Sequence, residues 1–294
     1  MKKSSSGETT MFSGKCAAAT IATVLTLVGV SLCADTVRKD LHFKVGKHPT
    51  ISINNPYGPV IVRAGAPHQV TITAILHSDK VELDQSKSRN RVDVISHLLP
   101  GADLNTGIVE YEVLVPPDAN LTLHSDNGKV HAEKLHGDVT VAGNVGAIEV
   151  IDCAGGHIHV RTLNGAVSLN NVHGDVEIMS VGGDVVMTGV TGAQVAVNSN
   201  SGRIEYEGDF GGEGEYAFTS HTGNIEAVAP AYASIDVLAR STNGIVQSDF
   251  SLDPKHAPFL VRGANSLSGT LGKAASSVKL FSFSGKIRLK KRQN

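Results

Sequence analysis

The sequence has no tryptophan, and aromatic residues make up only 4% of its 294 residues. Aromatic side chains form the stacking surfaces of many sugar sites and single-strand nucleic-acid sites, so such surfaces are poorly supplied. Positive charge is not in excess either, because 26 Lys and Arg residues stand against 28 Asp and Glu residues, for a formal net charge of −2. Nucleic-acid-binding proteins usually carry a basic face. The composition therefore argues against nucleic acid as a partner.

Cysteine is also scarce, with three residues in the chain. Two of them, Cys16 and Cys33, lie near the N-terminus, so Cys153 is the only cysteine after residue 34. A lone cysteine cannot form an internal disulfide. Beside Gly155 and Gly156 it is typical of a small buried side chain rather than of a nucleophile.

Motifs for catalysis and for bound ions are missing as well. There is no Gly-x-Ser-x-Gly sequence, no phosphate-binding loop and no zinc-type Cys/His spacing. Calcium-binding β-rolls need Gly-Gly-x-Gly-x-Asp in each turn, and the sequence Gly182-Gly183-Asp184 lacks the remainder of that motif. We therefore predict a non-enzymatic protein with no cofactor and no calcium in its turns.

One long uncharged, apolar run is present, from Cys16 to Ala34, and lysines precede it. This pattern predicts an export signal over residues 1–34. The run is also close to the length that spans a bilayer, so an uncleaved membrane anchor remains an alternative. Lipidation at Cys33 is a third possibility, and translation could start at Met11 instead of Met1.

The chain after this leader, residues 35–294, reads as a single domain. Export would place it in the periplasm, in the cell envelope or outside the cell, with contact to a membrane only through an uncleaved leader. Its hydrophobic content, 41% over the whole chain, excludes a disordered protein.

Glycine is abundant, with 31 residues, and from Gly128 onward it returns every nine or ten positions. After most of these glycines, apolar residues stand two and four places further on, as Val139 and Val141 do after Gly137. Such alternation predicts a strand with one buried face, and each glycine marks the turn before it. The glycines that set the rhythm are Gly128, Gly137, Gly146, Gly156, Gly165, Gly174, Gly183, Gly192 and Gly202.

Two kinds of unit alternate in this array. One follows small polar residues, as in Ser125-Asp126-Asn127-Gly128, and the other has an apolar residue two places before its glycine, as Leu135 precedes Gly137. The true repeat is the pair, of about 18–19 residues, which corresponds to one coil with two strands. We therefore predict an all-β fold: a β-solenoid of the parallel β-helix or β-roll type.

Less regular β segments flank the array on both sides. Residues 35–120 read as opening or capping strands, 121–227 as the regular array and 228–294 as closing repeats. The charged segment from Asp79 to Arg91 predicts a solvated hairpin arm, and Ser284 to Leu289 predicts a last strand that closes the stack. Aromatic residues gather toward the C-terminus, from Tyr206 to Phe283, and we expect them to fill a wider core.

Several phrases of the sequence resemble a known family. LHSDNGKVHAEKLHGDVTV and RTLNGAVSLNNVHGDVEI in the array, ISINNPYGPVIVRAG before it and FSFSGKIRLKK at the close are similar to the bacterial adhesin-like family defined by the domain of unknown function DUF4097. The resemblance covers nearly all of residues 35–294. It implies an exported or envelope protein with a repetitive β fold, and it carries over no catalytic residues.

A two-stranded coil would bring polar side chains of successive turns side by side. Asp138, His157 and Asp175 would form one outward column, and His159 and Glu177 would lie in its neighbour, about 4.8 Å apart from rung to rung. Imidazole and carboxylate ligands so placed could hold a divalent metal, with His157, His159, Asp175 and Glu177 as the candidates. An ordinary hydrated polar ladder is the alternative. With three units per turn, His131 would instead lie beside His159 and the column would not exist.

We therefore expect an exported, non-enzymatic, adhesin-like β-solenoid that presents a repetitive polar surface for adhesion or scaffolding in the bacterial envelope. Its partner would be an envelope protein or a surface polysaccharide, and self-association through an uncovered terminal rung is a further possibility. The alternative is a periplasmic carbohydrate-active or metal-binding β-helix protein that uses the face formed by Asp138, His157, His159, Asp175 and Glu177.

Overall fold

The computed structural model describes residues 36–254 and 264–293. The predicted leader, with Cys33 and both candidate start residues, lies outside the described residues, as does Phe259. Contacts along the chain separate two units, Met1–Cys33 and Ala34–Asn294, and all described strands belong to the second. No helix in the described ranges is long and apolar enough to cross a membrane.

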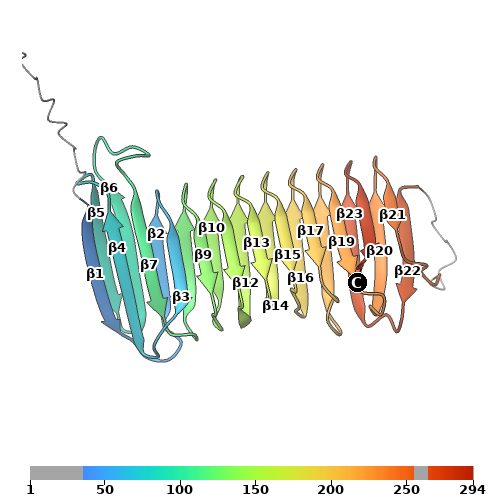
Figure 1. The fold of residues 1–294 in the computed structure, drawn as a ribbon, viewed down its shortest axis with the longest axis horizontal. Coiled ribbons are helices and arrows are strands. Elements are labelled where there is room, and N and C mark those ends of the chain that lie inside the picture. Colours follow the sequence, from blue (N-terminus) through green and yellow to red (C-terminus); the bar gives the residue numbers. More distant parts are fainter. Residues whose placement is uncertain (1–35, 255–263, 294) are drawn as a thin grey trace, which may run out of the picture. The chain divides into compact units, whose positions relative to one another are not determined.

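The described residues form 24 strands in two sheets of 12 strands each (Figure 1). In spatial order, sheet A contains β1 (Val37–Lys44), β4 (Gln69–Leu76), β7 (Val109–Val115), β3 (Val60–Ala64), β9 (Val130–Glu133), β11 (Ile148–Ile151), β13 (Val167–Asn170), β15 (Val185–Thr188), β17 (Ile204–Glu207), β19 (Ile225–Ala229), β24 (Ile287–Lys291) and β21 (Val246–Ser248). In spatial order, sheet B contains β22 (Ser266–Leu271), β20 (Ile235–Ser241), β23 (Ser276–Ser282), β18 (Glu215–Ser220), β16 (Gln194–Ser199), β14 (His173–Ser180), β12 (Ala154–Thr162), β10 (Val139–Gly143), β8 (Asn120–Ser125), β2 (Thr50–Asn55), β6 (Arg91–Leu98) and β5 (Val81–Ser88).

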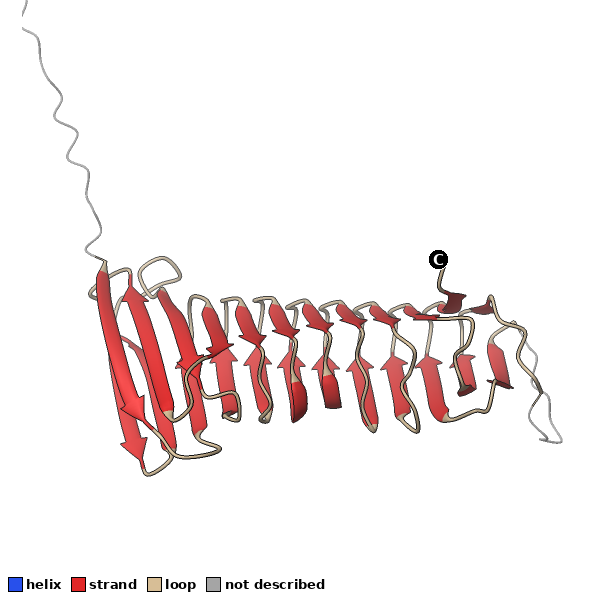
Figure 2. Cartoon of the chain, turned by 60° about the horizontal axis from the view of Figure 1, so that its bottom comes forward, coloured by secondary structure: helices blue, strands red, loops and turns tan. Residues whose placement is uncertain are grey.

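Each coil of the array contributes one strand to each sheet. In sheet B, Val139 of β10 pairs in parallel with Leu121 of β8, one coil earlier in the chain, and with Ile158 of β12, one coil later. The prediction of an all-β solenoid is therefore confirmed, with two strands per coil and with the pair of glycine-led units as its repeat. Figure 2 shows the resulting two layers of strands and the loops that join them.

The core fills the space between the two sheets. The inward residues Val139, Ile158 and Val176 are at most 2% exposed, and the columns that they form continue from rung to rung. Full burial of one such side chain contributes roughly 1.5–3 kcal/mol, so the stacked columns supply most of the driving force for the fold.

Glycine is required in the array because the chain of one coil lies directly against the next. A Cβ on Gly165 would stand 2.1 Å from the carbonyl oxygen of Gly146 in the preceding coil. Three residues earlier, the buried hydroxyl of Thr162 accepts a hydrogen bond from the Gly165 N–H at 2.9 Å. This bond closes the turn, and it explains why a small hydroxyl residue stands three places before many of the glycines.

The order of coils along the molecule departs from chain order at both ends. The coil of β2 and β3 lies between that of β6 and β7 and that of β8 and β9, and β24 lies between β19 and β21. The prediction that Ser284 to Leu289 closes the stack is therefore wrong, although Ile287 and Leu289 do point inward. Alternation specifies which side chains face the core, but it cannot specify which neighbour a strand pairs with.

Three of the four strands at the sheet edges, β1, β5 and β22, pair antiparallel with their neighbours, whereas β21 pairs in parallel. β1 carries Arg38, Lys39 and Asp40, and β5, with Glu82 and Asp84, pairs antiparallel with β6. Most side chains of β5 are exposed and the strand turns back into β6, which confirms the predicted hairpin, but Val81 is buried and β6 packs against the core through Val92 and Val94. Charge on an edge strand opposes pairing with another molecule.

The aromatic residues toward the C-terminus differ in burial, and Phe250 and Phe281 are partly buried. Tyr206, Phe210, Tyr216 and Phe218 are fully buried, and the rings of Tyr206 and Phe210 stack with centroids 4.5 Å apart. Phe283, in contrast, is 47% exposed. The expectation that these aromatics fill the core therefore holds for the four buried residues, holds in part for Phe250 and Phe281, and is wrong for Phe283, because that residue lies in a turn.

Cys153 is the one cysteine in the described part of the chain, and it is 2% exposed. Burial raises the pKa of its thiol, and the Sγ atom contacts the carbonyl oxygen of Ile151 at 3.4 Å. The prediction of a small buried residue is confirmed.

Candidate functional site

The polar columns predicted on the outer face exist in sheet B. His157 of β12 lies opposite Asp175 of β14, and His159 lies opposite Glu177. On the other side of β12, His159 pairs with Thr140 of β10. His131 lies in β9 of sheet A, so the winding with three units per turn is excluded.

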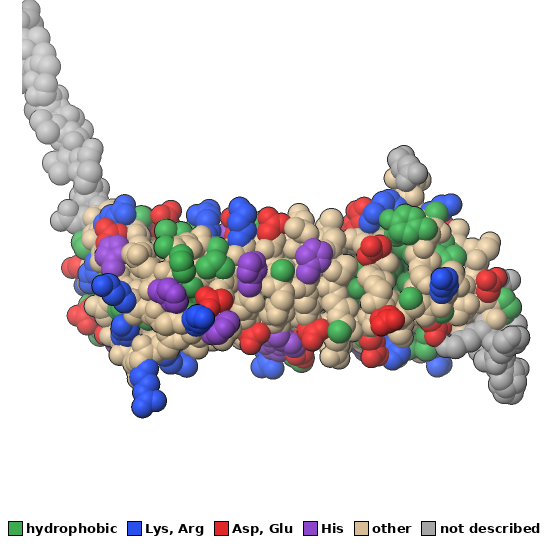
Figure 3. Space-filling model, turned by 90° about the horizontal axis from the view of Figure 1, so that it is seen from below, with side chains coloured by type: hydrophobic (Ala, Val, Ile, Leu, Met, Phe, Trp, Pro, Cys, Tyr) green, Lys and Arg blue, Asp and Glu red, His purple; other side chains and the backbone are tan. Residues whose placement is uncertain are grey.

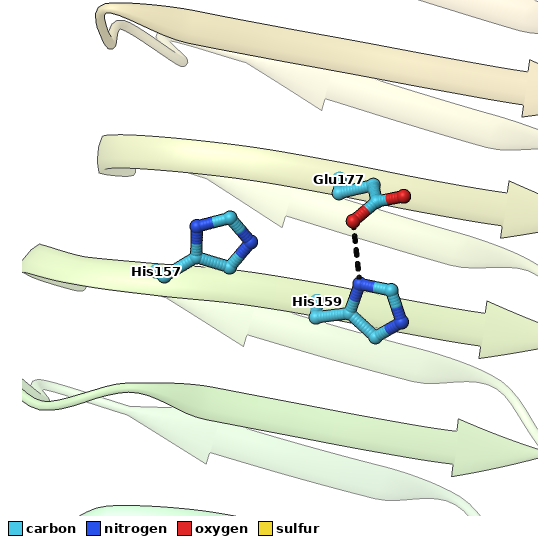
Figure 4. Close-up of side chains that lie close together, drawn as sticks. All are labelled: His157, His159 and Glu177. Atoms are coloured by element: carbon cyan, nitrogen blue, oxygen red, sulfur yellow. Dashed lines mark hydrogen bonds and ion pairs between the residues drawn. The ribbon is translucent and has the colours of Figure 1, made fainter.

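Three of these side chains come together. Nδ1 of His159 and Oε2 of Glu177 are 3.0 Å apart, and candidate ligand atoms of His157, His159 and Glu177 all lie within 4.8 Å of one another (Figure 4). His157 is exposed, whereas His159 and Glu177 are partly buried. The close-up shows both imidazoles rising from one strand and the carboxylate coming from the next.

The two aspartates of the column, Asp138 and Asp175, have a structural role that the sequence did not predict. Oδ1 of Asp138 accepts the backbone N–H of His157 at 2.9 Å, and Oδ1 of Asp175 accepts that of Gln194 at 3.0 Å. Each carboxylate thus ties its own coil to the following one. Asp175 lies next to the cluster of His157, His159 and Glu177 without being part of it. A signal was present in the sequence, because both aspartates directly follow an array glycine.

The cluster borders a depression of about 210 Å³. Its described lining includes His157, Asp175 and Glu177, and no lysine or arginine. The local charge is therefore negative or neutral, which favours a cation over an anion at this place.

A similar pair lies on sheet A. Nδ1 of His131 and Oε2 of Glu149 are 3.2 Å apart, again one coil from each other in the chain. Here the residue two places before the histidine is Lys129, whose Nζ lies 2.7 Å from the same carboxylate oxygen. The hydrogen bond from Lys129, with a smaller contribution from His131, holds the pKa of Glu149 below its usual value.

A second feature of sheet B was not predicted. Where its strands end and the small polar turns begin, two adjoining depressions of about 910 and 300 Å³ share Met179 and Ser180. Together they form a trough across β8, β10, β12, β14, β16, β18, β23 and β20, which we call the turn groove. Its larger part spans β14 to β20, roughly 20 Å at about 4.8 Å per rung.

The turn groove combines cationic, polar and apolar groups. Arg161 lines the smaller part and Arg240 the larger part, and neither guanidinium group has a hydrogen-bond or ion-pair partner among the described residues. The rings of His221 and Phe283 stack with centroids 4.9 Å apart and planes 10° from parallel. No aspartate or glutamate is among the described lining residues.

The sequence held a signal for this groove. In each small polar turn, the residue directly after the buried hydroxyl residue points outward. Two such residues, Leu163 and Val181, are apolar and are 49% and 46% exposed.

Outside the turn groove, positive and negative side chains are interspersed on the surface. Figure 3 shows one face on which charged side chains of both signs and several histidines are spread along the long axis instead of forming one field.

Comparisons with known proteins give a family and two solved structures. The family model described as Toastrack DUF4097 matches residues 48–290. No curated protein matches the chain. A crystal structure described as a putative cell adhesion protein from Clostridium sporogenes is 12% identical, with 87% of this chain and 100% of that chain covered and a TM-score of 0.26. One described as a putative adhesin from Bacteroides fragilis is also 12% identical, with 87% and 97% covered and a TM-score of 0.44.

Proposed function

The chain belongs to the Toastrack DUF4097 family, and from that premise we propose that it is an exported, non-enzymatic, adhesin-like β-solenoid that binds an anionic polysaccharide of the bacterial envelope along the turn groove. The single observation that carries this proposal is the groove itself, because it crosses many rungs of sheet B and ends on no closed catalytic pocket among the described residues. A long, open trough suits an extended polymer.

The positive charges of the turn groove favour an anionic partner. Arg161 and Arg240 project from it without partners among the described residues, and its described lining contains no carboxylate to repel an anion. Guanidinium groups bind carboxylates and phosphates through paired N–H donors. Polysaccharides that carry uronate or phosphate groups at regular intervals therefore complement the groove better than neutral ones.

The remaining groups suit a sugar chain. Asn198, Asn200 and Thr219 offer amide and hydroxyl groups to sugar hydroxyls, and the exposed ring of Phe283, which stacks on His221, offers apolar surface to the C–H groups of a pyranose. The rung spacing of about 4.8 Å is comparable to the length of one sugar unit in an extended chain, so equivalent contacts can recur along the polymer.

Two of the three candidate carboxylates on sheet B, those of Asp138 and Asp175, support a binding role over a catalytic one, and the third, Glu177, is paired with His159. Asp138 and Asp175 each accept a backbone N–H from the following coil, so their side chains are held as structural links. Glycoside hydrolysis needs one carboxylic acid and one carboxylate that face a sugar bond from two sides. Neither aspartate projects freely for such a task.

Retention on immobilised polysaccharide tests the proposal. The purified full chain should bind columns of alginate or polygalacturonate and should pass a column of neutral dextran, and binding should weaken as salt screens the arginines. The double substitution Arg161→Ala with Arg240→Ala should weaken binding at least tenfold, and Phe283→Ala should weaken it further.

Arg203→Ala is the matched control, because Arg203 stands just before β17 of sheet A, where Asp184 and Glu205 pair with it. This variant should bind like the original chain. Passage through every anionic column, or equal retention of the double variant, would refute the polysaccharide proposal. So would retention of an envelope protein by the same chain with no affinity for any polysaccharide.

Export is tested separately. Residues 1–34 fused to alkaline phosphatase should give activity outside the bacterial cytoplasm, because that enzyme needs disulfides that form only there. A fusion that stays inactive would contradict export. Replacing Cys33 with alanine distinguishes lipidation from simple cleavage, since only a lipidated leader would lose its membrane fraction.

A further inference from the structure

We propose that His157, His159 and Glu177 form a binding site for a divalent transition metal, with Zn²⁺ as the expected ion. This site is separate from the turn groove, and it would stand even if the polysaccharide proposal failed. Two imidazole nitrogens and one carboxylate oxygen are a common zinc ligand set, with water in the remaining position.

The distances lie near those that a metal needs. Ligands about 2.1 Å from a tetrahedral Zn²⁺ are about 3.4 Å from each other. Nδ1 of His159 and Oε2 of Glu177 are already 3.0 Å apart, so this pair needs to widen only slightly. The third ligand, His157, lies within 4.8 Å and is exposed, so its ring is free to rotate toward the other two.

The chemistry of the pair is compatible with a metal. Without a metal, the Nδ1–H group of His159 donates a hydrogen bond to the carboxylate of Glu177. On binding, the ring proton resides on Nε2 and the Nδ1 lone pair coordinates the ion, so the imidazole stays neutral. Protons compete with the metal for both rings, and binding should therefore weaken in acid.

The backbone directly before His157 contains an irregularity of the β-bulge type. Among the described strand pairs, the register of β12 and β14 shifts between Ala154 and His157, directly at this residue. Gly155 within the shift has a φ of +81°, which suits glycine. Bulges of this kind re-aim side chains and are common beside functional sites. Beyond the bulge, Asp138 fixes the position of β12 by accepting the N–H of His157.

The surroundings favour a cation of this class. The depression beside the cluster has room for water ligands, and its described lining holds Asp175 and no lysine or arginine. Calcium and magnesium prefer sites made of oxygen ligands, whereas imidazole nitrogen suits zinc, nickel and copper.

The His131–Glu149 pair on sheet A shows what the site would be without its second imidazole. The histidine and the carboxylate have the same spacing in the chain and nearly the same distance, but Lys129 takes the place equivalent to His157. An ammonium group there repels a metal cation. This pair is therefore a matched internal control.

Isothermal titration of the tag-free full chain with Zn²⁺ tests the proposal, in a background with Cys16→Ser and Cys33→Ser to remove thiol ligands. We expect one Zn²⁺ per chain and no binding of Ca²⁺ or Mg²⁺. His157→Ala and His159→Ala should each weaken binding at least tenfold, and Glu177→Gln should weaken it less, because the amide oxygen remains a ligand, although a poorer one than a carboxylate.

His131→Ala and His173→Ala should leave the titration unchanged. Circular dichroism checks that each variant is folded, which we expect because His157 is exposed. A chain that binds no Zn²⁺, or one whose stoichiometry and affinity survive the loss of both His157 and His159, overturns the proposal. In the second case the ion would be held by scattered surface histidines.

Discussion

Nδ1 of His159 lies 3.0 Å from Oε2 of Glu177, although the two residues belong to successive coils of the chain. The distance follows from the winding, since one full coil returns the chain to the adjacent strand of the same sheet, in register. Within the regular array, an outward polar residue therefore lies beside the residue one coil later. Chemistry on this surface depends on the coil period more than on local sequence.

Gly165→Ala should destabilise the fold. A Cβ there would stand 2.1 Å from the carbonyl oxygen of Gly146, so a coil would have to shift, at a cost of about 1–3 kcal/mol or more in the free energy of unfolding. Gly212→Ala is the control, because a Cβ at Gly212 meets no atom within 4 Å. Thermal denaturation should show a clear loss for the first variant only; equal melting temperatures would contradict the proposed close approach.

Lys129→His should create a second metal site. Lys129 already reaches Oε2 of Glu149, so an imidazole there would join His131 and Glu149 in the arrangement of the first cluster. Titration with Zn²⁺ should then show two ions per chain instead of one. Lys129→Gln, which removes the same charge without adding a ligand, should leave the number at one. If Lys129→His still binds a single ion, the spacing alone does not make a site.

Cys153 should resist modification in the folded protein. Its thiol is buried and its raised pKa disfavours the reactive thiolate. With Cys16 and Cys33 replaced by serine, labelling by a disulfide reagent at pH 8 should be slow in buffer and complete at once in denaturant. Fast labelling of the native chain would show that this part of the core opens readily.

The ion pair of Lys129 and Glu149 should make a small, pH-dependent contribution to stability. The folded-state pKa of Glu149 is lowered, so the unfolded chain binds more protons in acid, and the contribution is present at neutral pH and lost as pH falls through the folded pKa. Both side chains are partly exposed, at 49% and 33%, so the pair is worth about 0.2–1 kcal/mol at most. Melting curves of Lys129→Gln and the original chain should differ at pH 7 and converge near pH 2. A difference that grows in acid would reverse the assigned sign.

Charge on the β5 edge should keep the protein from pairing with itself. Glu82 and Asp84 lie on this outermost strand of sheet B, whose far side has no neighbouring strand among the described residues. Replacing both with valine should produce concentration-dependent association in analytical ultracentrifugation, since an uncharged edge accepts another strand. Replacing both with lysine keeps the edge charged and should leave the sedimentation unchanged. Association of the lysine variant to the same extent would point to another contact surface.

Much of the site geometry could be predicted from the sequence. The alternation after each glycine places Val139, Ile158 and Val176 inward, and the coil period places His159 beside Glu177. The capture of the Asp138 and Asp175 carboxylates by backbone N–H groups was not predicted, because a hydrogen bond depends on side-chain rotation that periodicity does not encode. The turn groove was missed because it arises from the shape of many stacked turns, each unremarkable alone.

The sequence by itself determined the coiled β fold, the inward columns and the rows of outward side chains, because apolar residues alternate along each strand and two kinds of glycine-led unit alternate along the chain. Only the tertiary structure shows the order of the coils at the two ends, where β24 lies between β19 and β21. The physical reason is that every coil offers its neighbours nearly the same apolar face and the same backbone hydrogen bonds. The local sequence pattern therefore cannot specify which neighbour each strand pairs with. The loops that connect the end coils and the strands at the sheet edges determine that order.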